Sequence, residues 1–356
     1  MAQLIAQLDA QAAALQANAY ALNSQKSISV ALNSMYKFCL ATGLWPRSEQ
    51  GGWSVTDICR YIAWLGGQVG SIDTVGNYLT NGPRIYHMMY GLPWKDKYES
   101  WGVTLALRGL KRVKGAGRPG QKLPMTPELL LAIRSQLDFT QLNDISLWAA
   151  CLVAFYGFLR KSNYAPETEK AATDPHILRR CDVIQRPGHQ RLWLRLRHTK
   201  TIQYQERLLE LALPCMPGHL LDPFTALFVY LNVTKSRPAT EWLFGRLDDK
   251  GTWRPMTDEW MMKRVRELLQ RASPGIDVSR YGTHSFRRGG ATYALRVGVS
   301  PVLIKLMGDW RSECFYDYCS VDEELREVAA DLLAEHMWSS LSRGPSPAAP
   351  AGPPAR

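Results

Sequence analysis

The sequence contains no segment long enough to span a membrane and no cysteine pair with the spacing of a metal site. Its most apolar run, residues 145–159, is shorter than the roughly 20 residues that a membrane helix needs, and it contains Gly157. We therefore expect a buried core helix there. The 7 cysteines are scattered and odd in number, without a CxxC pair. This pattern indicates free thiols in a reducing compartment rather than a disulfide framework.

Arginine is missing from residues 1–26, and no secretory signal is visible. Both absences argue against a targeting peptide. The segment is instead rich in Ala, Gln and Leu, which favours a helix over about residues 1–23. We expect an N-terminal arm, 1–26, that either contacts a neighbouring subunit or lies at the periphery of its own.

Acidic residues are in the minority, since 43 Lys and Arg face 32 Asp and Glu, and the net charge is +11. A strongly basic chain suits a polyanionic partner such as nucleic acid, although a merely basic soluble protein has the same balance. A hydrophobic content of 46% with 12 Trp indicates packed globular structure. At 356 residues the chain is long enough for two domains, each with its own core.

The first domain is predicted over residues 27–112 and reads as helical throughout. Its last helix ends in a group of cations that can meet phosphates, although such a run is also typical of a solvated helix face. These cations are Arg108, Lys111, Arg112 and Lys114. The helices are expected at 29–42, 54–65, 73–89 and 100–112.

Residues 113–125 are rich in Gly, Pro and basic side chains and have almost nothing to bury, so they predict an interdomain linker. A second domain is expected over 126–341, followed by a disordered Pro/Ala tail, 342–356. The alternation of Leu and Arg over 191–197 predicts a half-buried strand that pairs with 207–213. Further helices are expected at 127–137, 145–159, 223–231, 256–271, 285–297 and 322–341.

The stretch from Gly282 to Ser320 carries polar groups that local structure brings together. His284 and Arg287 lie three residues apart at the start of the helix predicted over 285–297, and a short helix from Pro301 ends at Gly308. We expect the following Gly-Asp-Trp, 308–310, to be exposed. A third helix, capped by Ser312, carries Tyr316 and Tyr318.

These groups suit attack on a phosphodiester without a metal. Arg160 and Arg287 present rigid forks to the non-bridging oxygens, and His284 and the Trp310 N–H donate to the same group. The remaining roles need an acid and a nucleophile. Lys200, at the hairpin end, is placed to protonate the leaving 5′-oxygen, and Tyr318 to form a phosphotyrosine ester. Each residue alone has an ordinary structural explanation, and only their order and spacing favour chemistry.

That order resembles the tyrosine recombinase (phage-integrase-like) family, whose catalytic set runs Arg, Lys, His-x-x-Arg, His or Trp, then Tyr. The segments that carry the resemblance are FYGFLR ending at Arg160, HTKT around Lys200, HSFR from His284 to Arg287, GDW ending at Trp310, and Tyr318. The form GFLRKSN, with Trp in the His position, looks most like the recombinases of eukaryotic DIRS-type and Crypton-type mobile elements.

The resemblance implies a mainly α fold with a small antiparallel β-sheet. A helical core-binding (SAM-like) domain would precede an α+β catalytic domain. It also implies cleavage and rejoining of double-stranded DNA through a 3′-phosphotyrosyl intermediate, without metal or nucleotide cofactor. The expected assembly is a homotetramer on two DNA sites, with the helix at 322–341 docked on a neighbouring protomer. Nuclear localisation follows from the mobile-element subfamily, and no membrane association is expected.

Two features depart from the family. Asn163 stands where an acidic residue often follows the first Arg, and an amide supplies no charge. The Trp310–Tyr318 spacing is one residue shorter than in several phage enzymes, which leaves Tyr316 as a rival nucleophile. Two other interpretations stay open: a DNA-binding descendant that no longer catalyses, and a type IB topoisomerase.

Overall fold

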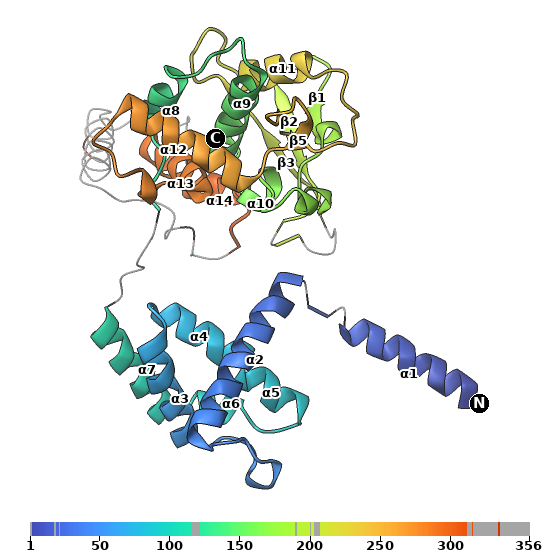
Figure 1. Cartoon of the computed structure of the whole chain (residues 1–356), viewed down its shortest axis with the longest axis vertical. Coiled ribbons are helices and arrows are strands. Elements are labelled where there is room, and N and C mark those ends of the chain that lie inside the picture. The colour runs from blue at the N-terminus through green and yellow to red at the C-terminus, as the bar shows by residue number, and fades with distance from the viewer. Residues whose placement is uncertain are drawn as a thin grey trace, which may run out of the picture. The chain divides into compact units, whose positions relative to one another are not determined.

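The computed structural model describes residues 2–17, 19–20, 22–115, 122–188, 191–199, 201–202, 207–311, 315 and 334. The chain divides into two compact units, Met1–Gln121 and Lys122–Arg356, both drawn in Figure 1. This division falls within the segment expected to be a linker. Apart from Phe315 and Ala334, the predicted third helix of the candidate stretch, the final helix at 322–341 and the tail lie outside the described residues.

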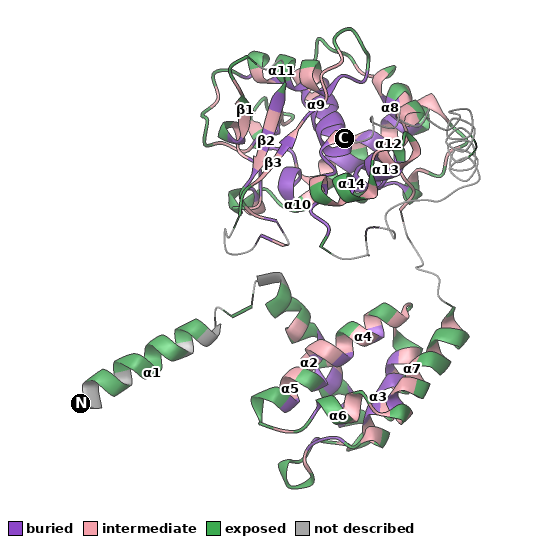
Figure 2. Ribbon diagram, turned by 180° about the vertical axis from the view of Figure 1, so that it is seen from behind, coloured by how far each residue is buried: buried purple, intermediate pink, exposed green. Residues whose placement is uncertain are grey.

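The first unit opens with helix α1 (Ala2–Ala17), whose described side chains are all exposed (green in Figure 2). Helix α2 (Leu22–Thr42) follows. The boundary expected between arm and domain, at 26/27, therefore falls inside α2. The remaining helices are α3 (Val55–Gln68), α4 (Ile72–Asn81), α5 (Pro83–Met89), α6 (Lys95–Tyr98) and α7 (Trp101–Lys114), with a 3₁₀ turn at Ser48–Gln50.

Side-chain caps set where these helices begin. Ser54 and Asp57 form a capping box at α3, and Ser71 and Ser100 accept hydrogen bonds from backbone N–H groups in the first turns of α4 and α7. The single helix expected over 73–89 is wrong. It is broken between α4 and α5, because Pro83 has no N–H to continue α4 and its fixed φ suits the first position of a new helix.

An aromatic cluster forms the core of the first unit. Phe38 packs edge-on against Trp53, with ring centroids 5.5 Å apart, and Tyr61 lies 5.1 Å from Phe38. The fully buried His87 accepts a hydrogen bond from the backbone N–H of Trp53 at 3.2 Å. Burial lowers the pKa of His87, which favours the neutral ring that this bond requires.

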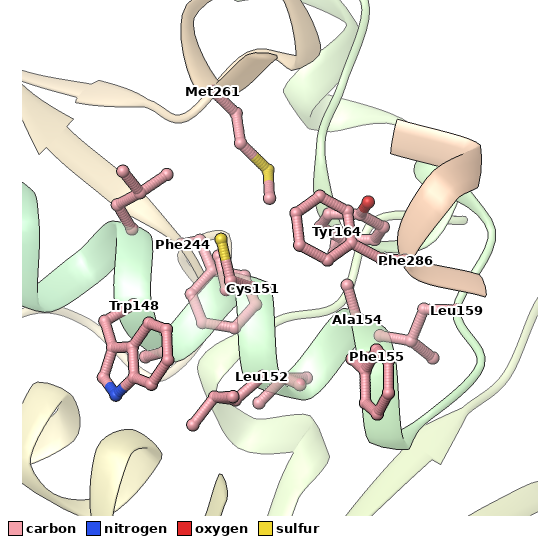
Figure 3. Close-up of a cluster of buried hydrophobic side chains, with 14 of the residues drawn as sticks. Trp148, Cys151, Leu152, Ala154, Phe155, Leu159, Tyr164, Phe244, Met261 and Phe286 are labelled. Atoms are coloured by element: carbon pink, nitrogen blue, oxygen red, sulfur yellow. The ribbon is translucent and has the colours of Figure 1, made fainter. Parts of the chain in front are cut away.

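The second unit is organised around helix α9 (Leu142–Tyr156), which is buried along most of its length (purple in Figure 2). Figure 3 shows α9 side chains such as Cys151 and Phe155 among Phe244, Met261 and Phe286 from other elements. The other helices are α8 (Pro127–Arg134), α10 (Lys161–Tyr164), α11 (Pro223–Val233), α12 (Asp258–Ala272), α13 (Thr283–Arg296) and α14 (Pro301–Met307). Short 3₁₀ helices lie at Lys170–Thr173, Arg180–Asp182 and Val278–Arg280.

Two small antiparallel sheets accompany these helices. The first has the order β1 (Val183–Gln185), β2 (Leu192–Leu196), β3 (Leu209–Ala212), and the second pairs β4 (Gly245–Leu247) with β5 (Trp253–Pro255). The alternation read in the sequence is confirmed, since the three Leu of β2 are buried while Trp193 and Arg195 are partly exposed. The predicted fold class, mainly α with a small antiparallel sheet, is confirmed. No helix among the described residues combines the length and the apolar character of a membrane span.

Helix α13 approaches its neighbours unusually closely through two glycines. A Cβ built on Gly289 would lie 1.8 Å from the carbonyl oxygen of Met125, and one on Gly290 would lie 2.1 Å from that of Phe155. The Met125 N–H also donates to the Ser285 carbonyl at 2.8 Å. Backbone–backbone contact therefore fixes α13 against the start of the second unit and the end of α9.

Candidate active site

Helix α13 carries both residues of the His-x-x-Arg pair. Arg287 is buried, 2% exposed, and its guanidinium donates to the carbonyls of Phe158 and of Gly308, the latter at 2.6 Å. The group also lies over the Trp310 ring, 3.7 Å from its centroid. One side chain thus joins α13 to the loop after α9 and to the loop after α14.

The loop after α9 brings Arg160 to the same place. Gly157 ends α9, Phe158 turns the backbone with a φ of 46°, and Arg160 follows at the start of α10. Its guanidinium donates to the Asp309 carbonyl at 2.9 Å and pairs with the Asp309 carboxylate at 3.2 Å. The two guanidinium groups thus bind successive carbonyls, of Gly308 and Asp309. The side chain of Arg160 keeps 19% of its surface exposed.

The expectation that the Gly-Asp-Trp segment is exposed is wrong. Gly308, Asp309 and Trp310 are all buried, because Arg287 and Arg160 bind the carbonyls of Gly308 and Asp309, and Asp309 has a left-handed backbone with a φ of 54°. Trp310, 6% exposed, joins a small apolar cluster with Phe158 and Phe315. The Trp310 ring stacks against the Arg287 guanidinium in a cation–π contact.

Asp309 is the residue that sequence reasoning missed as part of the site. Its side chain is 2% exposed and accepts hydrogen bonds from Arg160, Thr199, Thr201 and Arg207. Burial by itself raises the pKa of Asp309, but these four donors outweigh it and hold the pKa below its usual value. The only local signal was an acid directly after a helix-ending glycine, which is equally typical of an exposed turn.

His284 lies one turn before Arg287 and is exposed. Surrounding protein atoms partly desolvate its ring, and this effect, followed by the nearby cations Lys161, Arg287 and Arg160, lowers its pKa. The neutral imidazole is therefore favoured near pH 7, with one nitrogen able to donate and the other to accept.

Asn163 is buried, 2% exposed, and uses its amide in a way that a carboxylate cannot. Its Nδ2 group donates to the carbonyls of His176, at 3.1 Å, and His198, at 3.2 Å. His198 immediately precedes the turn that contains Thr199. The amide at this position therefore serves as a donor that fixes the base of that turn.

We expect Asn163→Asp to destabilise the second unit by about 2–4 kcal/mol, because a buried carboxylate would face two carbonyl oxygens with no proton to offer at neutral pH. Chemical denaturation at pH 7.5 measures the loss. Asp249→Asn, an exchange of the same pair of residues at an exposed position, is the control. Equal stability of Asn163→Asp and wild type would contradict the donor role of Asn163.

The structure brings Arg160, His284, Arg287 and Trp310 into one region of the second unit. Lys200, Tyr316 and Tyr318 lie outside the described residues. On either side of Lys200, Thr199 and Ile202 form an antiparallel bridge, which places a tight turn at 199–202. Within the described ranges no group of three His, Cys, Asp or Glu side chains is arranged to hold a metal ion.

The cations proposed to meet phosphates lie at the end of α7 in the first unit. Arg108, Lys111 and Arg112 are exposed. The Arg108 guanidinium lies over the Trp101 ring, 5.6 Å from its centroid, and the Lys114 amine donates to the Val69 carbonyl at 2.7 Å. This hydrogen bond connects the C-terminal end of α7 to the residue that follows α3.

The sequence matches no family model and no curated protein. Solved structures share its fold. The XerH site-specific recombinase bound to its palindromic difH substrate is 14% identical, with 87% of this chain and 79% of that chain covered and a TM-score of 0.53. The lambda integrase dimer bound to a COC′ core site is 10% identical, with 88% of this chain and 94% of that chain covered and a TM-score of 0.52.

The Tn1549 transposon integrase in complex with transposon right end DNA is 14% identical, with 85% of this chain and 99% of that chain covered and a TM-score of 0.51. The chain therefore has the fold of the tyrosine recombinases.

Proposed function

We propose that this protein is a DNA strand transferase that cleaves and rejoins double-stranded DNA through Tyr318. The observation that carries the proposal is the meeting of Arg160 and Arg287 at the Gly308–Trp310 loop, with His284 one turn before Arg287 on α13, in a fold shared with DNA-bound recombinases. In sequence the two arginines and the loop come from three separate segments, so their convergence is a property of the fold.

The reaction assigns one role to each group. The Tyr318 oxygen attacks the phosphorus, the bond to the 5′-oxygen breaks, and a 3′-phosphotyrosyl ester forms. The phenolic proton leaves to a base, for which the neutral His284 is suited, and Lys200 gives a proton to the 5′-oxygen. Arg160, whose side chain is partly exposed, binds a non-bridging oxygen, and the buried Arg287 adds a second positive charge to the site. Rejoining reverses these steps.

The wider setting is also part of the proposal. The basic end of α7, with Arg108, Lys111, Arg112 and Lys114, contacts DNA phosphates, and the protein acts as a tetramer on two sites. It serves a eukaryotic mobile element of the DIRS or Crypton type and works in the nucleus. Its DNA affinity falls with salt by roughly 0.9 log units per contacted phosphate for each decade of salt concentration.

Covalent trapping tests the proposal. On nicked duplexes of randomised sequence, wild type should form a protease-sensitive DNA adduct, and Tyr318→Phe should lose it by at least about 10³-fold because no other group replaces the nucleophile. Tyr316→Phe is the matched control and should retain the adduct. Loss of the adduct in Tyr316→Phe alone would move the nucleophile to that residue.

A second function is favoured by the deep burial of Arg287 and by the engagement of Arg160 with Asp309. Both arginines are already paired within the protein, as expected of a DNA-binding descendant that has lost catalysis. Salt-sensitive DNA binding without an adduct from any variant would support this alternative. Relaxation of supercoiled plasmid without sequence preference would instead support a topoisomerase.

A further inference from the structure

Asp309 is an anion at the centre of a cationic site, which needs an explanation. A carboxylate near a bound phosphate repels it, and a buried carboxylate costs solvation free energy unless it is fully paired. Here both oxygens are paired: Oδ2 accepts from Arg160 and from the hydroxyls of Thr199 and Thr201, and Oδ1 accepts from Arg207. Such a group is suited to holding other groups in place rather than to binding DNA.

The partners of Asp309 come from distant segments. Arg160 begins α10, whereas Thr199, Thr201 and Arg207 all belong to the hairpin between β2 and β3. Thr199 is fully engaged, because its hydroxyl also accepts from the N–H groups of Thr201 and Ile202 at 3.1 Å each. The carboxylate therefore binds the residues immediately before and after position 200 in the sequence.

We propose that Asp309 is a positioning residue whose carboxylate anchors the 199–201 turn to Arg160 and so sets where Lys200 delivers its proton. The inference rests on the proposed function in one respect, the role of Lys200 as the acid. The anchoring itself is a property of the DNA-free protein. Asp309 does not touch the DNA in this scheme, and its effect on the reaction passes through the turn.

The leaving group separates this role from a general structural one. A substrate with sulfur in place of the 5′-bridging oxygen releases a thiolate, which needs no proton because its conjugate acid is far stronger than an alcohol. On ordinary DNA, Lys200→Ala and Asp309→Asn should both slow adduct formation, Asp309→Asn by about 10–100-fold through misplacement of the acid. On the sulfur substrate both variants should return to within about threefold of wild type.

Asn is chosen because it tolerates the left-handed backbone at position 309 and keeps the shape of the side chain. Thr201→Val removes one hydroxyl donor without changing side-chain volume and should reproduce part of the effect. Asp249→Asn, an exposed acid, should behave as wild type on both substrates. An equal defect of Asp309→Asn on the two substrates, or no defect on either, overturns the proposal.

Hydrogen exchange tests the anchor without any reaction. In the DNA-free full chain, Asp309→Asn should speed exchange of the Thr201 and Ile202 amides by at least about tenfold, relative to Asp249→Asn, because the turn loses its tether. Unchanged exchange overturns the proposal even if catalysis is impaired. A third result is that wild type forms no adduct on either substrate while Asp309→Asn still exchanges faster. That combination would refute the proposed function and would confirm that Asp309 anchors the turn.

Discussion

Replacement of Gly289 by alanine is expected to destabilise the second unit by at least about 3 kcal/mol, or roughly 6–12 °C in Tm for a unit of this size. The added Cβ would lie 1.8 Å from the Met125 oxygen and 2.7 Å from its carbonyl carbon. No side-chain rotation relieves a clash between a Cβ and a backbone carbonyl. Helix α13 or the segment before α8 must therefore move.

Gly275→Ala is the matched control for this experiment, since it lies in the same unit and a Cβ there meets nothing within 4 Å. Its stability should stay within about 0.5 kcal/mol of wild type. Thermal and chemical denaturation measure both variants, and a readout specific to the second unit, such as hydrogen exchange of α9, assigns the loss. Equal stability of the two variants would show that the close approach is easily relaxed.

The second large effect is expected for Arg287→Lys, a substitution that keeps the charge. Adduct formation should fall by at least about 10²-fold, because one ammonium cannot donate to two carbonyls, lie flat on Trp310 and direct charge at the phosphate. The second unit should also lose about 2–4 kcal/mol, since a buried carbonyl is left unpaired.

Arg271→Lys controls for the exchange of one cation for the other, because Arg271 is exposed near the end of α12. It should leave adduct formation within about twofold of wild type. Rates are compared at a temperature at which both variants are fully folded, so that instability does not imitate a catalytic defect. Retention of full activity by Arg287→Lys would show that charge alone suffices at this position.

The parts of the fold that sequence predicts well are local. Caps such as Ser54 and Thr126, and the three-residue spacing of His284 and Arg287, act within one helical turn. The break before Pro83 is equally local, and the proline itself was the signal. Strands β1, β4 and β5 have only three residues each, too few for an alternation to be read.

The site is predicted less completely, because its bonds join residues far apart in the chain. Asp309 lies 149 residues from Arg160 and 110 from Thr199, so no spacing rule connects them. Its burial reverses the ordinary expectation for an acid in a turn and becomes reasonable only once its donors are known. Asn163 illustrates the same point. From sequence alone, its amide is only the absence of an acidic residue, whereas in the structure it donates to the carbonyls of His176 and His198.

The two glycines of α13 also fix the position of this helix along its axis. A shift of the helix along its axis by one residue would bring Arg288 or Ala291, each with a Cβ, against the carbonyls that Gly289 and Gly290 now face. The register of α13 is thus locked, and Arg287 with it. Any rearrangement of the second unit that keeps this packing intact therefore also keeps the α13 backbone, which carries the buried Arg287, in place. Under the function proposed above, the positive charge of Arg287 would then keep one position throughout the reaction.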